Sequence, residues 1–130
     1  MANITAHIGR THYVTTIRNA SNEIIADEPL EQGGTDAGFS SAELLAASLA
    51  TCTSITLRMY ADRKGWPLEA IEVAIHFERD IDTKTAQFVR NIKFFGTLND
   101  EQKQRMLQIA DKCPVHQVLT NPIRIQTVLT

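Results

Sequence analysis

The sequence predicts an α+β fold in a single domain spanning residues 1–130. Apolar residues alternate in several short runs and recur at helical spacing in longer ones, and the runs come in blocks instead of strict alternation. At 43% hydrophobic and 22% charged residues the composition is that of a soluble globular protein. A chain of this length buries roughly two-thirds of its unfolded surface, enough for one core. We expect the order βββ-α-ββ-α-α-β.

The N-terminal part of the chain predicts three strands and a loop. Runs rich in Ile, Val, Thr and Tyr at 3–8, 12–18 and 22–26 are separated by "GR" and "NASN", which favours an antiparallel meander. The polar stretch "DEPLEQGGTDAGFS", with three glycines and a proline, follows as a loop.

A long helix is expected over residues 41–64. Ser40 and Glu43 have capping-box spacing, and "KGWP" supplies a terminating glycine and a proline beyond it. The first half is apolar on almost every side and the second half carries charges, so we expect the helix to begin in the core and emerge from it.

A hairpin follows the helix. Residues 69–79 alternate cleanly between apolar and polar positions, and a second strand at 86–95 carries Phe88, Ile92 and Phe94 after the turn "DIDTKTA".

The C-terminal part predicts two helices and a strand. Asn99 and Gln102 can form a capping box, and an apolar stripe at helical spacing ends at Cys113. Pro114 disfavours helical geometry at the residue before it but suits the first position of a helix, which predicts a break and a short helix over 114–119. "IRIQTVL" is expected to close the chain as a strand.

Charge and hydropathy exclude two classes of partner. A net charge of −2 gives no electrostatic reason to expect nucleic acid. The N-terminus lacks a basic stretch followed by an apolar core, and the apolar run around 44–50 is far shorter than the ~20 residues that span a bilayer, so we expect no membrane association. A cytoplasmic protein is therefore expected, and its two cysteines should pair only transiently.

Local chemistry favours Cys113 as the more reactive thiol. At the N-cap of the 114–119 helix, backbone N–H groups and the helix dipole favour the thiolate, and Lys112 would help. A core cysteine that ends an apolar stripe is the equally weighted alternative.

Cys52 has the weaker local case. A thiol within an apolar helix should have a raised pKa and be inert unless a positive group folds against it, and Arg10, Arg18 and Arg90 are candidates for that group. From local sequence alone, Cys52 is more readily explained as a structural residue.

Two other chemistries fit less well. The "CPVH" pair could contribute to a zinc site with Cys52 and one of His7, His12 or His76, but a structural zinc site usually has two such close pairs. We therefore expect no metal. A nucleophile elbow of the form G-x-S-x-G is missing from the sequence, which argues against a serine hydrolase.

The segments "GGTDAGFSSAELLAASLATCT", "LRMYADRKGWPLEAIEVAIHFER" and "LNDEQKQRMLQIADKCPVHQVL" resemble the OsmC-like family of thiol peroxidases, which includes the organic hydroperoxide resistance proteins. The resemblance runs over nearly the whole chain, and "ATC" together with "KCPVH" is its most specific part. It implies an OsmC-like fold with antiparallel sheets around a long central helix, and an intertwined homodimer with two active sites at the subunit interface.

The resemblance also implies roles for individual residues. Cys52 would be the peroxidatic nucleophile and Cys113 the resolving thiol, which reverses the local ranking. Arg10, by its place in the loop between the first two strands, would ionise Cys52, with Arg18 as the alternative. Leu49 and Met59 would line an apolar pocket for an organic hydroperoxide.

The implied cycle passes through a sulfenic acid at Cys52 and a Cys52–Cys113 disulfide. An external dithiol would reduce the disulfide, as lipoyl groups do in the best-studied branch of the family, and no cofactor is implied.

One position departs from the family pattern. The hydroperoxide resistance branch has a catalytic glutamate ten residues before the nucleophile, where this chain has Ala42. Glu43 stands nine residues before Cys52, on the opposite side of the helix at ~100° per residue, and it is better explained by the capping box. The carboxylate that would hold the arginine is therefore either missing or supplied from elsewhere, with Asp27 and Glu28 as candidates. The departure itself indicates a more divergent OsmC-like branch.

This departure keeps a second function open. A non-catalytic stress-response module with the same fold could bind a small apolar ligand at the dimer interface.

Overall fold

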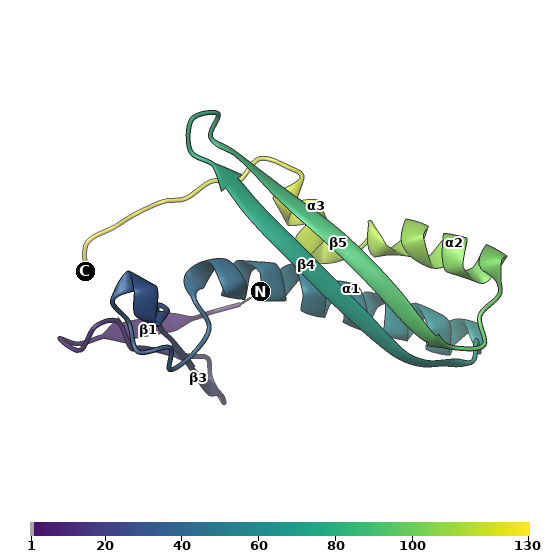
Figure 1. Ribbon diagram of the computed structural model, residues 1–130, viewed down its shortest axis with the longest axis horizontal. Coiled ribbons are helices and arrows are strands. Elements are labelled where there is room, and N and C mark those ends of the chain that lie inside the picture. The colour runs from purple at the N-terminus through teal and green to yellow at the C-terminus, as the bar shows by residue number, and fades with distance from the viewer. Residues whose placement is uncertain (1) are drawn as a thin grey trace. The chain divides into compact units, whose positions relative to one another are not determined.

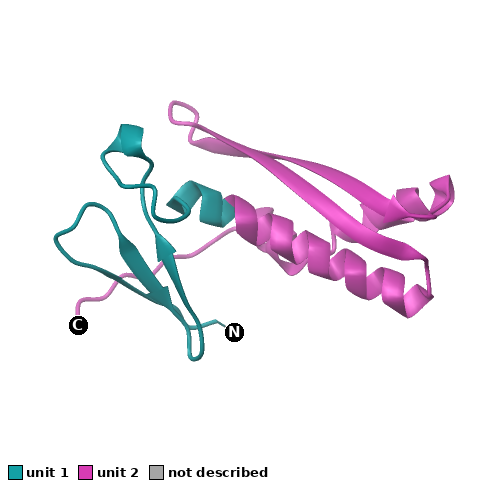
Figure 2. Cartoon of the chain, turned by 60° about the horizontal axis from the view of Figure 1, so that its bottom comes forward, with its two compact units in different colours: residues 1–45 teal, residues 46–130 magenta. Residues whose placement is uncertain are grey.

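The computed structural model describes residues 2–130 and divides the chain into two compact units, residues 1–45 and 46–130 (Figure 2). Each unit is described by itself below. The chain has the mixed α+β architecture with antiparallel strands that the sequence predicts. The expectation of one domain over residues 1–130 stays a prediction.

Unit 1 contains a three-stranded antiparallel sheet in the order β1-β2-β3, which confirms the predicted meander (Figure 1). Short turns join consecutive strands, so each strand pairs with its neighbour in sequence. Arg18 and Glu23 face each other across the second pair, and their side chains form an ion pair. The strands are β1 (Thr5–Ile8), β2 (Thr15–Arg18) and β3 (Glu23–Ala26).

The loop after β3 is organised by the buried carboxylate of Asp27, which is 3% exposed. Its Oδ2 accepts hydrogen bonds from the hydroxyl and N–H of Thr35 and from the N–H of Ala37, and its Oδ1 accepts from the N–H groups of Tyr13 and Glu28. The Thr35 hydroxyl, followed by these backbone donors, holds the pKa of Asp27 well below its usual range despite burial. One carboxylate thus supplies acceptors for a segment with few backbone partners.

Glycine is required in this loop for close backbone approach. A side chain at Gly34 would overlap the Glu28 carbonyl, and one at Gly38 would overlap the Ile25 carbonyl. The 3-10 turn η1 (Leu30–Gln32) lies in this loop, after β3 and before Gly34 in the sequence.

Helix α1 (Ser41–Lys64) begins with the predicted capping box. The Ser40 N–H donates to Glu43 Oε1 at 2.9 Å, and the Glu43 N–H donates to Ser40 Oγ at 3.2 Å. Gly65, at φ 68°, ends the helix in the left-handed conformation.

The burial pattern along α1 differs from the prediction. The first turns of the helix are largely exposed, and the buried positions run from Leu49 to Ala61, so the expectation that the helix begins in the core is wrong. By length and composition α1 could also cross a membrane, which is weak evidence because the core helix of a soluble protein meets the same criteria.

In unit 2, β4 (Leu68–Asp80) and β5 (Thr85–Gly96) form the predicted hairpin, which lies across α1 (Figures 1 and 2). The core lies between the hairpin, α1 and the helix α2 (Asp100–Ala110). Its buried members are Leu57, Tyr60, Ala61, Leu68, Leu98, Met106, Ile109 and Ala110, with Trp66, Ile71, Ile92 and Phe94 packed against them.

Both C-terminal helices begin as predicted. Asn99 and Gln102 form the capping box of α2, and Cys113 is the N-cap of α3 (Pro114–Leu119) with Pro114 at its first position.

The predicted C-terminal strand is wrong for the single chain. Residues 122–130 have no regular structure and pair with no other strand of the part of the chain that the structure describes. A strand needs an edge to hydrogen-bond with, and alternation of apolar residues cannot supply one. The apolar side chains of this segment stay exposed, namely Ile123, Ile125, Val128 and Leu129.

Candidate active site

Unit 2 brings the two cysteines together. Cys52 is half-buried on α1, and its surroundings include the Cys113 thiol, the backbone of Val115 and the hydroxyl of Thr56. Burial raises the pKa of the Cys52 thiol, and interaction with the Cys113 thiol raises it further, against weaker opposite effects of Val115 and Thr56. The raised pKa confirms the expectation from a mid-helix thiol in apolar surroundings.

Cys113 is fully buried at the junction between α2 and α3. Its Sγ accepts a hydrogen bond from the N–H of His116 at 3.4 Å, and its own N–H donates to the Ala110 carbonyl at 3.3 Å. This is the N-cap position that the sequence predicts, where a backbone donor at the start of a helix faces the sulfur. Two free thiols that lie near one another can be oxidised to a disulfide, so the pair is chemically able to take part in redox chemistry.

A polar network surrounds this junction and is built on Arg90 of β5. Nη1 donates to Thr53 Oγ1 at 3.1 Å and to the Ala110 carbonyl at 3.4 Å, and Nη2 lies 2.9 Å from Asp111 Oδ1 and 3.4 Å from His116 Nδ1. Asp111 Oδ1 also lies 3.8 Å from His116 Nδ1. The network joins α1, the end of α2 and α3 to one strand of the hairpin.

Sequence reasoning named Arg90 only as one of three cations that could approach Cys52, and it missed Asp111 and the network. The strand pattern carried a signal for Arg90. Inward positions of β5 alternate as Phe88, Arg90, Ile92 and Phe94, all half-buried, so a charge interrupts an apolar stripe. Such an interruption indicates a buried partner for the charge.

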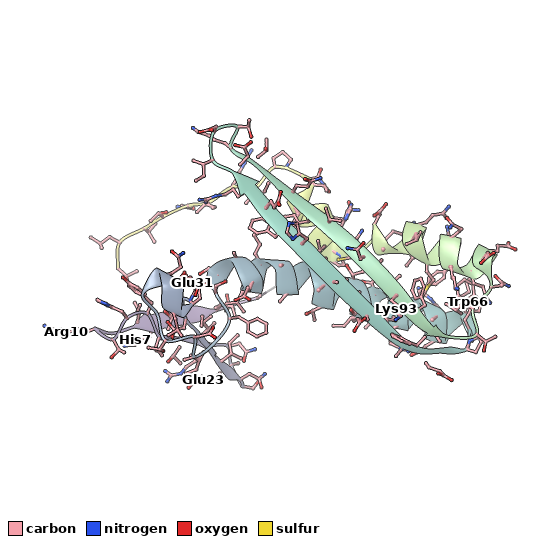
Figure 3. All side chains as sticks on the ribbon, viewed as in Figure 1. His7, Arg10, Glu23, Glu31, Trp66 and Lys93 are labelled. Atoms are coloured by element: carbon pink, nitrogen blue, oxygen red, sulfur yellow. The ribbon has the colours of Figure 1, made fainter. Side chains whose placement is uncertain are left out.

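The two arginines favoured by the resemblance lie in unit 1, whereas Cys52 lies in unit 2. Arg10 is exposed on the connection between β1 and β2 and points away from the strands (Figure 3), and Arg18 is engaged with Glu23. Their role towards Cys52 stays a prediction.

Two of the three candidate carboxylates, those of Glu43 and Asp27, form hydrogen bonds close to their own positions in the chain. Glu43 is held by Ser40, whose backbone N–H and hydroxyl lower the pKa of this carboxyl. The Asp27 oxygens accept hydrogen bonds from Tyr13, on the connection between β1 and β2, and from donors in the loop after β3, one of which is the backbone N–H of Glu28.

The two predicted pocket residues have opposite surroundings. Leu49 is buried in unit 2, whereas Met59 is 65% exposed. Met59 shares one stripe of α1 with Cys52 and with Ile55, which is 49% exposed, because the three residues stand at i, i+3 and i+7. We call Cys52, Ile55 and Met59 the Cys52 stripe.

Within residues 2–130, no group of three or more His, Cys, Asp or Glu side chains could hold a metal ion.

A protein-family model described as "OsmC-like protein" matches residues 33–128, which include both cysteines and the Arg90 network. The chain belongs to the OsmC-like family. A search of curated protein sequences found no match.

Solved structures agree with this assignment at the level of fold. An OsmC-like protein from Mycoplasma pneumoniae matches with a TM-score of 0.80 at 17% identity, over 92% of this chain and 87% of that one. A protein from Psychrobacter arcticus, described as an osmotic stress induced and detoxification response protein, matches with a TM-score of 0.78 at 23% identity, over 91% of this chain and 88% of that one. The organic hydroperoxide resistance protein OhrB of Bacillus subtilis matches with a TM-score of 0.61 at 21% identity, over 91% of this chain and 89% of that one. These low identities are consistent with a divergent branch of the OsmC-like family.

Proposed function

We propose that this OsmC-like protein is a cysteine-based peroxidase that reduces organic hydroperoxides to alcohols. The observation that carries the proposal is that two free thiols far apart in sequence, Cys52 on α1 and Cys113 at the start of α3, are neighbours in the fold. Membership of a family that includes organic hydroperoxide resistance proteins supports the same chemistry.

The reaction has two steps on the protein. The thiolate of Cys52 attacks the terminal oxygen of the hydroperoxide, the O–O bond breaks, and the alkoxide takes a proton and leaves as an alcohol. Cys52 is then a sulfenic acid. The Cys113 sulfur attacks the Cys52 sulfur, the S–O bond breaks, and the hydroxyl group leaves as water with the proton of the Cys113 thiol.

An external dithiol completes the cycle. It donates its two thiol hydrogens to Cys52 and Cys113 and becomes a cyclic disulfide itself. A lipoyl-type dithiol is the reductant that we propose, and the cytoplasm is the compartment that keeps such dithiols reduced.

The first step requires an ionised Cys52, and a raised pKa makes a nearby positive charge more important for this step. We propose that Arg10 ionises Cys52 in the assembled protein, with Arg18 as the alternative.

A homodimer would also cover the apolar surface of the site. The Cys52 stripe leaves Ile55 and Met59 exposed, and contiguous exposed apolar residues mark interaction surfaces. With the stripe covered by a second subunit, Met59 would line an apolar pocket that favours organic hydroperoxides over hydrogen peroxide. Sedimentation of the purified protein tests this, and a monomer at micromolar concentration would contradict it.

The experiment for the peroxidase adds one equivalent of cumene hydroperoxide to the reduced protein and measures intact mass. The wild type is expected to lose two hydrogens, and Cys113→Ser is expected to gain one oxygen that a 1,3-dione traps as a sulfenic acid adduct. An unchanged mass in the wild type would contradict the proposal.

The second candidate is a non-catalytic stress-response module that binds a small apolar ligand at the dimer interface. The raised pKa of Cys52 and the engagement of Glu43 in a helix cap favour it. It predicts that Cys52→Ser leaves hydroperoxide resistance of the host cell intact, whereas the peroxidase predicts that resistance is lost.

A further inference from the structure

Arg90 carries a charge at a position of β5 whose neighbours are apolar. It faces Ile75 across the hairpin, and the flanking inward positions Phe88 and Ile92 are half-buried aromatic and aliphatic side chains. The Arg90 side chain is only 14% exposed. Removing a guanidinium from water is costly unless its donors are satisfied, so the surroundings of this side chain must compensate for its burial.

The compensation comes from segments that carry the cysteines. Thr53, which accepts from Nη1, is the residue directly after Cys52 on α1. The Ala110 carbonyl accepts both from Nη1 and from the backbone N–H of Cys113. His116, which lies against Nη2, donates its own backbone N–H to Cys113 Sγ.

The planar guanidinium of an arginine has several N–H donors in fixed directions, so it can bond partners on several elements at once better than the single ammonium group of a lysine. The Arg90 guanidinium forms hydrogen bonds with residues near both cysteines. On α1 it bonds Thr53, next to Cys52, and at the α2–α3 junction it bonds Ala110 and His116, near Cys113. We propose that Arg90 is a positioning residue that holds Cys113 next to Cys52, so that the disulfide between them forms rapidly and within one chain.

The role belongs to the second step of the proposed reaction, and in that respect it rests on the proposed function. In this step the S–S bond forms, the S–O bond of the sulfenic acid breaks and water leaves. Holding two reacting groups together raises their effective concentration and removes most of the entropic barrier. Removing the hydrogen bonds of Arg90 should therefore slow disulfide formation and leave the attack of Cys52 on the hydroperoxide unchanged.

The test uses glutathione disulfide, which needs no peroxidase activity. Two protein thiols and one glutathione disulfide give the protein disulfide and two glutathione molecules, and the equilibrium constant is the effective concentration of the thiol pair. We expect Arg90→Gln to lower this value by about tenfold or more, the equivalent of one hydrogen bond to a charged group.

Two further variants guard the interpretation. Asp111→Asn changes a side chain that is 65% exposed, so it should preserve the fold and shift the equilibrium in the same direction by a smaller factor. Arg79→Gln removes an exposed arginine from the same hairpin and should leave the equilibrium unchanged. Circular dichroism establishes that each variant is folded.

A second measurement separates positioning from general loss of structure. When one equivalent of cumene hydroperoxide is added, folded Arg90→Gln should accumulate a trappable sulfenic acid although Cys113 is present, with the rate of Cys52 oxidation unchanged. If Arg90→Gln does not fold, Asp111→Asn serves for both measurements.

Unchanged effective concentration in a folded Arg90→Gln, or in Asp111→Asn if the first variant unfolds, would overturn the positioning role. A wild-type protein in which glutathione disulfide never links Cys52 to Cys113 would also overturn it. A wild-type protein that forms this disulfide but does not react with hydroperoxide would instead overturn the proposed function and leave the role of Arg90 standing.

Discussion

The two cysteines occupy contrasting regions of unit 2. Cys52 lies in the middle of a helix, where backbone N–H groups are committed to the helix itself, and burial raises its pKa. Cys113 lies at a helix start, where the N–H of His116 faces its sulfur and Arg90 braces the neighbouring residues. Within unit 2, burial and the Cys113 thiol thus outweigh the polar contacts of Cys52 with Val115 and Thr56, whereas the sulfur of Cys113 receives a backbone N–H at a helix start.

This contrast explains why the resemblance and the local chemistry rank the two thiols in opposite order. Local chemistry describes what each cysteine receives from its own unit, whereas the resemblance concerns the assembled protein. Burial and the Cys113 thiol raise the pKa of Cys52, so the proposed peroxidase activity depends on a positive group near this thiol, which we propose to be Arg10 or Arg18. The predictions below alter one side of the contrast at a time.

The largest effect is expected at the cysteines themselves. Cys52→Ser should abolish hydroperoxide consumption because no sulfur remains to attack the peroxide. Cys113→Ser should consume one equivalent and then stop in the absence of a reductant. A colorimetric hydroperoxide assay measures the consumption by both variants. If Cys113→Ser does not consume the first equivalent of hydroperoxide, the assignment of the nucleophile to Cys52 is wrong.

The next effect concerns ionisation of Cys52. We expect Arg10→Gln to raise the pKa of Cys52, because burial and the Cys113 thiol then act without an opposing charge. A higher pKa means less thiolate at any given pH, so a shift of one pH unit slows alkylation at neutral pH by about tenfold. Alkylation by iodoacetamide across pH 6–11, resolved by peptide mapping, gives the midpoint.

Arg18→Gln is the matched comparison for Arg10→Gln. If only this variant moves the midpoint, Arg18 is the activating residue. If neither variant moves it, both assignments are wrong.

A smaller effect is expected from Thr53→Val. The valine keeps the shape of the buried threonine but removes an acceptor of Arg90, so the free energy of unfolding should fall by about 1–3 kcal/mol. Urea unfolding measures the loss. Thr51→Val, on an exposed face of the same helix, should change little, and equal losses in both variants would count against the Arg90 network.

The smallest effect is expected from Glu43→Gln. Glutamine preserves the capping box, so both helix stability and the rate of Cys52 oxidation should stay close to those of the wild type. Stopped-flow oxidation by cumene hydroperoxide measures the rate. A marked slowing in a stable variant would mean that the Glu43 carboxylate takes part in the reaction.

Features with local causes were predictable from the sequence. The hairpin follows from strict alternation, both capping boxes follow from residues three apart, and the N-cap position of Cys113 follows from Pro114. Each cause lies within a few residues of its effect.

Features that depend on distant partners were not predictable in this way. The sequence marks Arg90 as a charge among apolar neighbours, but its bonds to Thr53 and Asp111 depend on how three elements pack. The prediction of a C-terminal strand was wrong for a related reason, because alternation of apolar residues does not create the edge of another strand with which to pair.

The most direct test of the account is peptide mapping of the wild-type protein after one equivalent of cumene hydroperoxide. The account predicts a disulfide between the peptide containing Cys52 and the peptide containing Cys113, formed within one chain and released by a dithiol. Oxidation that leaves Cys113 as a free thiol, or that links Cys52 to the Cys52 of another chain, would contradict it.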